Sequence, residues 1–156
     1  MTVLTNGSPA PEFNVVNQAN QSISLAGFKG KKNIVLYFYP KDDTPGCTIE
    51  ANQFTALADD FTKADAIVLG VSKDDCQSHQ AFIDKFGLKI DLLADTLGEV
   101  CEAYGVWQEK ERNGSKSMGI VRSSFVINKE GVLVEALYGV TAEGHAQEML
   151  SVVKSL

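Results

Sequence analysis

Hydrophobic residues form continuous runs in some segments of this chain and alternate with polar residues in others. Residues 33–39 (NIVLYFY) and 66–71 (AIVLGV) are continuous apolar runs, mostly β-branched, aliphatic or aromatic. Such runs are typical of strands that are buried on both faces of a mainly parallel sheet. A shorter run at 91–94 predicts a short third strand. Apolar and polar residues alternate around the turn-rich segment 17–20, which predicts a small β-hairpin at one edge of the sheet.

Helical spacing of apolar residues follows the first of these runs. Apolar residues recur there every three or four positions, which places one stripe on a helix whose first turn contains Cys47. The stripe consists of Cys47, Ala51, Phe54, Ala58 and Phe61. A second helix is predicted from about Cys76 to a stop at Gly87, a third from Leu97 to Tyr104, and a last one near the C-terminus. The residues that the last helix turns inward are Ala146, Met149, Leu150 and Val153.

The region before the last helix contains one further hairpin. Residues 123–128 and 132–138 are largely apolar and flank a three-residue turn, which predicts two antiparallel strands. The polar segment 107–116 before them is interpreted as a surface loop. No internal repeat, low-complexity tract or long linker interrupts the chain. We therefore expect one α/β domain spanning residues 1–156.

Composition narrows the classes of function. The 156 residues carry a formal net charge of -6, and no stripe of Lys and Arg could hold a phosphate backbone, so nucleic-acid binding is not expected. No apolar run reaches the length of a membrane span, and the start of the chain lacks the basic and apolar segments of a signal peptide. The three cysteines are widely spaced, unlike a secreted disulfide framework. We expect a cytoplasmic protein without membrane contact.

Cys47 has the sequence environment of a reactive thiol. In the segment PKDDTPGC, Thr44 takes the N-cap position, Pro45 the first helical position and Cys47 the third. Free N–H groups and the positive end of the helix dipole favour an anion there, and the thiolate is the nucleophilic form of cysteine. Because a helix terminus typically stabilises an anion by only about 0.3 to 1 kcal/mol, we expect a nearby cation as well.

Two arginines could supply this cation. Arg122 directly precedes the apolar run 123–128, whereas Arg112 lies in the polar segment. We favour Arg122 because a residue at the end of a strand is held more rigidly than one in a loop. Attack of sulfur on a peroxide would build negative charge on the leaving oxygen. A guanidinium, the Thr44 hydroxyl and the free N–H groups of the helix could receive that charge.

Each of these residues also has a purely structural interpretation. Cys47 could be a small residue of the hydrophobic core, Thr44 a simple helix cap and Pro40 a strand terminator. Cys76 and His79 have the spacing of two zinc ligands on one helix face. The residues that could add further soft ligands, Cys47, Cys101 and His145, are not clustered with them in sequence, so we expect no metal and no cofactor. The remaining polar candidates are interpreted as loop charges or as solvated or capping histidines; they are Asp42, Asp43, Asp74, Asp75, His79 and His145.

The segment around Cys47 resembles a known family. Pro40-x-x-x-Thr44-x-x-Cys47 is similar to the active-site motif of the peroxiredoxins, and segments along nearly the whole chain resemble the Q subfamily, also called bacterioferritin comigratory protein. These segments are YFYPKDDTPGCT, SKDD-x-x-SH-x-x-F, EAYGVW and GIVRSSFVIN. The resemblance implies a thioredoxin-like fold, with a central mixed sheet flanked by helices. It also implies reduction of hydrogen peroxide and organic hydroperoxides by Cys47, with Thr44 and Arg122 as hydrogen-bonding and cationic partners and Pro40 as a shield.

The resemblance leaves open how Cys47 is regenerated. The resolving cysteine of this subfamily commonly lies at one of two places, which correspond to Asn52 and Ile83 here. Cys76, on the same predicted helix as Ile83, could replace it after local unfolding; otherwise an external thiol reduces the sulfenic acid in a one-cysteine mechanism. The resemblance implies thioredoxin, glutaredoxin or glutathione as reductant, and a monomer. Cys101 is interpreted as a core residue.

Two other functions share parts of this pattern. A thioredoxin-like disulfide oxidoreductase needs two nearby sulfurs, as in Cys-x-x-Cys, and the residue three after Cys47 is Glu50. The sequence features around Cys47 would also fit a redox-sensing binding protein that signals through oxidation of Cys47. A sensor would consume about one peroxide per thiol, whereas a peroxidase would continue to turn over while reductant is present.

Overall fold

A five-stranded mixed sheet forms the centre of the computed structural model, which describes residues 3–156 apart from the side chain of Arg112. The strand order is β5-β4-β3-β8-β9. Strands β3, β4 and β5 are parallel, β8 pairs antiparallel with β3, and β9 pairs antiparallel with β8. Their bounds are β3 (Asn33–Phe38), β4 (Ala66–Ser72), β5 (Asp91–Ala94), β8 (Ser123–Ile127) and β9 (Leu133–Tyr138). The strands predicted from the apolar runs are therefore confirmed.

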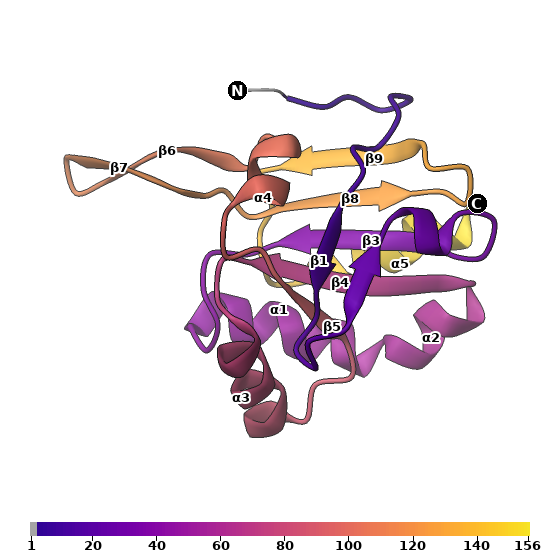
Figure 1. The fold of residues 1–156 in the computed structure, drawn as a ribbon, viewed down its shortest axis with the longest axis horizontal. Helices are drawn as coiled ribbons and strands as arrows, with labels where there is room; N and C mark the ends of the chain where they lie inside the picture. The colour runs from indigo at the N-terminus through magenta and orange to yellow at the C-terminus, as the bar shows by residue number, and fades with distance from the viewer. Residues whose placement is uncertain (1–2) are drawn as a thin grey trace.

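Two layers cover the faces of this sheet (Figure 1). Successive side chains of β3 point to opposite faces, so Val35 and Tyr37 belong to one core cluster and Leu36 and Phe38 to the other. The first cluster is completed by α1 (Pro45–Ala56), α2 (Ala58–Lys63), α3 (Cys76–Phe86) and α5 (His145–Lys154). The second is completed by β1 (Asn14–Val16), β2 (Ser22–Ser24), the 3-10 helix η1 (Ala26–Phe28) and α4 (Glu99–Ala103).

Local sequence sets both ends of α3. The Ser78 N–H donates to Asp75 Oδ1 at 2.8 Å, so Asp75 caps the start of the helix. Gly87 adopts a φ of 64°, in the left-handed region, and ends it as predicted. No helix within residues 3–156 is long and apolar enough to cross a membrane.

The segment predicted to be a polar loop is instead a second hairpin. Strands β6 (Trp107–Arg112) and β7 (Ser115–Ile120) pair antiparallel, and the hairpin projects from the rest of the molecule (Figure 1). Asn113 and Gly114 form the turn, with φ values of 54° and 82°. Positive φ values at both positions are typical of the two-residue loops that join the strands of a hairpin. The prediction was wrong because polar side chains on a projecting hairpin hide the alternation that marks a half-buried strand.

Two further expectations also need correction. The N-terminal hairpin forms as predicted but packs over a face of the sheet. The bridge from Asn17 to Leu93 and hydrogen bonds of the Gln18 side chain with Asp91 and Leu92 join it to the edge strand β5. The apolar stripe that begins at Cys47 spans two helices, because Leu57 leaves helical geometry with φ -101° and ψ 7°. The stripe survives this break, since both Phe54 and Phe61 remain buried.

Candidate active site

Cys47 occupies the first turn of α1, at the end of the sheet where β3 leads into the helix. Thr44 is the N-cap and Pro45 the first helical residue, so Cys47 is third, as predicted. Cys47 is buried, with 2% of its surface exposed. The Thr44 side chain makes no capping hydrogen bond to the helix; its hydroxyl instead donates to the Lys41 carbonyl at 2.8 Å. The hydroxyl therefore leaves the first N–H groups of α1 free of a side-chain cap.

Arg122 lies far from Cys47 in the sequence but contacts it in the structure. It lies immediately before β8, and its Nη2 is 3.3 Å from Cys47 Sγ. Its Nη1 donates to Glu50 Oε1 at 2.6 Å, so one guanidinium joins the sulfur to a carboxylate. Burial alone would lower the pKa of Arg122, but Glu50 and Cys47 raise it overall, which keeps the guanidinium charged. A Cβ at Gly46 would lie 3.0 Å from Nη2, so the missing side chain makes room for this approach.

Glu50 is a site residue that the sequence analysis missed. Its side chain is fully buried, and burial raises its pKa to about 7 although the Arg122 guanidinium opposes the shift. Among the described residues, its Oε2 has no hydrogen-bond partner, and neither has the buried hydroxyl of Tyr37. A signal was present in the sequence, because a residue three after Cys47 lies on the same inward face of the helix. A carboxylate on that face requires a buried partner.

The other predicted residues lie in different surroundings. Pro40 is exposed at the bend that follows β3. Cys76 is half-buried at the first position of α3, and all three cysteines are free thiols. Cys101 is fully buried, and desolvation together with Asp95 raises its pKa, which confirms its interpretation as a core residue. The side chain of Arg112 lies outside the described residues.

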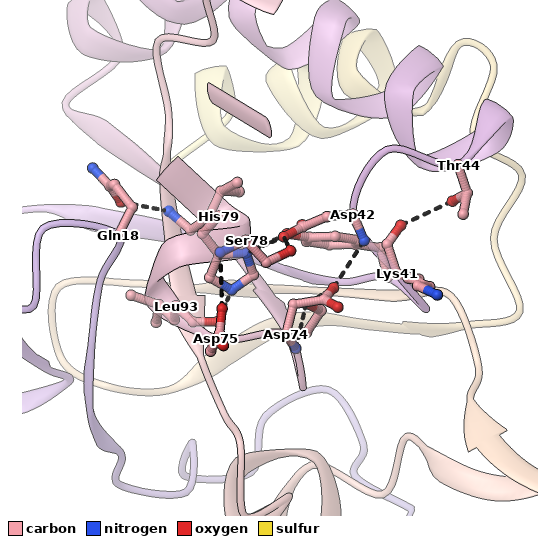
Figure 2. A network of polar contacts seen from close by, with 12 residues as sticks. Gln18, Lys41, Asp42, Thr44, Asp74, Asp75, Ser78, His79 and Leu93 are labelled. Atoms are coloured by element: carbon pink, nitrogen blue, oxygen red, sulfur yellow. Dashed lines mark hydrogen bonds and ion pairs between the residues drawn. The ribbon is translucent and has the colours of Figure 1, made fainter. Parts of the chain in front are cut away.

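Three polar side chains are buried, contrary to the interpretation of Asp42 as a loop charge and of His79 and His145 as solvated or capping histidines. Asp42 and His79 are buried, and His79 Nδ1 lies 2.7 Å from Asp42 Oδ2 (Figure 2). His145 is buried as well, with its Nε2 2.7 Å from Ser124 Oγ. The sequence analysis failed here because a polar residue is buried when a distant segment supplies its hydrogen-bond partner, and that partner is not visible locally.

Asp42 and His79, together with Asp74, form a group of described residues that lie close enough together to hold a metal ion. Atoms of Asp42, Asp74 and His79 lie within 4.8 Å of one another. Both ring nitrogens of His79, however, already contact oxygen atoms, of Asp42 and of the Leu93 carbonyl. Cys76, which the sequence analysis weighed as a zinc ligand beside His79, is not in this group.

Comparison with known proteins identifies the family. The AhpC/TSA family pattern matches residues 6–136. The chain is also 40% identical over 150 residues to the peroxiredoxin Bcp of Bacillus subtilis (strain 168), which covers 96% of this chain and 95% of that protein. The chain is a peroxiredoxin of the AhpC/TSA family. This peroxiredoxin is therefore an enzyme, a thiol-dependent peroxidase.

Solved structures of other peroxiredoxins share its fold. Peroxiredoxin Q of Xanthomonas campestris superposes with a TM-score of 0.87 at 38% identity, over 92% of this chain and 90% of that one. A mutant of PrxQ from Xylella fastidiosa gives a TM-score of 0.92 at 33% identity, over 99% and 98% of the two chains. The thioredoxin-like fold and the resemblance to the Q subfamily are thereby confirmed.

Proposed function

We propose that Cys47 is the residue that attacks the peroxide. The thiolate sulfur attacks the terminal oxygen of ROOH and breaks the oxygen–oxygen bond, so that Cys47 becomes a sulfenic acid. The released alkoxide takes up a proton and leaves as ROH. The observation that carries this proposal is the 3.3 Å contact between Cys47 Sγ and Arg122 Nη2 at the start of α1. A charged guanidinium stabilises the thiolate before the reaction and the expelled oxygen during it.

Thr44 is proposed to orient the substrate. A hydroxyl carries one hydrogen, which Thr44 donates to the Lys41 carbonyl, and its lone pairs then accept the O–H of a hydroperoxide. The uncapped N–H groups at the start of α1 are available to the second peroxide oxygen. Pro40, exposed beside this loop, is proposed to limit the access of water to the sulfur.

Glu50 is proposed to hold Arg122 in place. The guanidinium reaches Glu50 with Nη1 and Cys47 with Nη2, so its orientation is fixed by two contacts at once. The buried carboxylate also explains why a thioredoxin-like disulfide exchange is a poor alternative. The position where a second sulfur of a Cys-x-x-Cys motif would lie is filled by the partner of Arg122.

The substrates we propose are hydrogen peroxide and organic hydroperoxides. A structure of the Xanthomonas campestris bacterioferritin comigratory protein concerns alkyl peroxide reduction, and it covers 92% of this chain at 37% identity. We propose thioredoxin, glutaredoxin or glutathione as the reductant and a monomer as the working form. The free thiols are consistent with action in a reducing compartment such as the cytoplasm. An external thiol would reduce the sulfenic acid, with Cys76 as the alternative.

Turnover with each reductant tests this proposal. The protein, Cys47→Ser and the control Cys101→Ser are given hydrogen peroxide or an alkyl hydroperoxide, and peroxide loss is followed together with mass spectrometry of the trapped sulfenic acid. We expect repeated turnover and a sulfenic acid at Cys47 in the parent and in Cys101→Ser, and neither in Cys47→Ser. Peroxide loss at the parental rate in Cys47→Ser would refute the assignment. A single turnover per thiol with every reductant would point to a redox sensor instead.

A further inference from the structure

A buried network outside the Cys47 site ties the loop before α1 to the rest of the molecule (Figure 2). Asp42 Oδ1 accepts from the Tyr39 hydroxyl at 2.6 Å, and Oδ2 accepts from Ser78 Oγ at 2.8 Å and lies 2.7 Å from His79 Nδ1. The main-chain N–H of Asp42 donates to Asp74 Oδ2 at 2.8 Å. Asp42 thus connects the loop to α3 and to the segment that follows β4.

Both ring nitrogens of His79 contact oxygen atoms. Nε2 lies 2.9 Å from the Leu93 carbonyl oxygen, and Nδ1 faces the Asp42 carboxylate, so both nitrogens face acceptors. A ring with a proton on each nitrogen would donate to both of these oxygen atoms. Burial alone would raise the pKa of Asp42, but hydrogen bonds from His79, Tyr39 and Ser78 lower it overall. The two side chains are 0% and 4% exposed, so water does not compete for this pair.

Asp42 is mechanically coupled to Thr44. Only Asp43 separates them, and it adopts a φ of 57°, in the left-handed region that turns the chain toward α1. The Thr44 hydroxyl donates to the carbonyl of Lys41, on the other side of Asp42, and the Thr44 carbonyl accepts from Thr48 in the first turn of the helix. A displacement of Asp42 would therefore move both the Thr44 hydroxyl and the helix start.

We propose that the Asp42–His79 pair is a positioning unit for peroxide reduction, which holds the Thr44 hydroxyl and the first turn of α1 where they meet the hydroperoxide. This inference rests on the proposed function of Cys47. Neither Asp42 nor His79 touches the sulfur or the substrate, so both act through Thr44. Attack on a peroxide needs hydrogen-bonding groups aligned with the breaking bond, whereas simple alkylation of the thiolate does not. Loss of the pair should therefore slow the first reaction selectively.

The test compares two reactions of Cys47 in the full-length reduced protein. His79→Phe removes the hydrogen bonds of both ring nitrogens, with Asp42, Tyr39 and Leu93. The rate constants for hydrogen peroxide and for iodoacetamide are then measured in single turnover. We expect the peroxide rate constant to fall by about ten-fold or more while the alkylation rate constant stays within about two-fold of the parental value. Lys85→Ala is the matched control, because the exposed pair of Lys85 with Asp43 joins the same helix to the same loop. The ratio of the peroxide rate constant to the alkylation rate constant in Lys85→Ala should equal the parental ratio.

Each other outcome would overturn the inference. Unchanged rate constants would mean that the pair does not position the site, and a parallel fall of both would mean that it only supports the fold. Should His79→Phe lack the parental circular dichroism spectrum, Asp42→Asn, which keeps the side-chain volume, must show the same selective fall. Cys47→Ser separates this inference from the proposed function. If Cys47→Ser still reduces peroxide, the function itself fails; if it is inactive and His79→Phe keeps the parental ratio, only the positioning role fails.

Discussion

Replacing Glu50 with Gln should remove a pH-dependent contribution to the stability of the protein. Glu50 is 0% exposed, and its Oε1 lies 2.6 Å from Arg122 Nη1, whereas its Oε2 has no hydrogen-bond partner in the part of the chain that the structure describes. Burial raises its pKa from an ordinary value of 4.5 to about 7, and the Arg122 guanidinium opposes the rise only in part. The folded protein therefore holds the proton of the Glu50 carboxyl group more tightly than the unfolded chain does.

The sign of the effect follows from the proton count. Between pH 4.5 and about 7 the folded state carries more protons than the unfolded state, so the free energy of unfolding falls as the pH rises. The contribution is fully present below pH 4.5 and is lost as the pH rises through about 7. This difference in pKa corresponds to about 3 kcal/mol. Because the amide of E50Q does not ionise, the variant should gain stability over its parent across this window.

Urea unfolding of the parent and of E50Q, from pH 4.5 to above 7, measures the effect. Both proteins carry Cys47→Ser, so that ionisation of the thiol does not contribute. Glu130→Gln, at an exposed position, controls for the loss of one carboxylate from the chain. The difference in unfolding free energy between E50Q and its parent should change by up to about 3 kcal/mol over the window. Parallel stability curves would refute the argument that Glu50 is held in a desolvated site.

The remaining predictions concern the approach of Arg122 and the fate of the sulfenic acid. Gly46→Ala should displace the guanidinium and slow peroxide reduction by about ten-fold, whereas Gly27→Ala, whose nearest neighbour would be 3.4 Å away, should not; equal single-turnover rates would contradict this. Cys76→Ser should keep the parental turnover with glutathione, because Cys76 begins a helix whose first turn is fixed by the buried network. Lost turnover together with a disulfide from Cys47 to Cys76 in the parent would contradict that expectation.

The sequence predicted those parts of the molecule whose causes are local. Strand β3 is buried along all six residues, and its apolar run alone indicates a central strand. Thr44, Pro45 and Cys47 take the predicted helix positions because the preference for proline at the first helical position acts locally, although the Thr44 side chain makes no capping hydrogen bond. The choice of Arg122 over Arg112 needed one further idea, that a residue at a strand end is held rigidly. Its contact with Cys47 spans 75 residues of sequence.

The parts that the sequence did not predict depend on partners that lie far away along the chain. Glu50 meets Arg122 across 72 residues, and Asp42 meets His79 across 37. A buried carboxylate is tolerated only when such a partner is present, so its own neighbours in sequence do not reveal whether it is buried. The prediction for the β6–β7 hairpin failed for a different reason. Among the described residues of its two strands only Ile120 is buried, so no clear alternation results.

Oxidation of Cys47 by hydrogen peroxide in Arg122→Met is the most direct test of the central claim, that a guanidinium beside the sulfur drives the reaction. Arg122→Lys is measured beside it, because a lysine keeps the charge but lacks the fork that reaches Glu50 and Cys47 together. The account predicts that the single-turnover rate constant falls by about 10²-fold in Arg122→Met, and by less in Arg122→Lys, while both variants keep the parental circular dichroism spectrum. Reaction of folded Arg122→Met at the parental rate would contradict it.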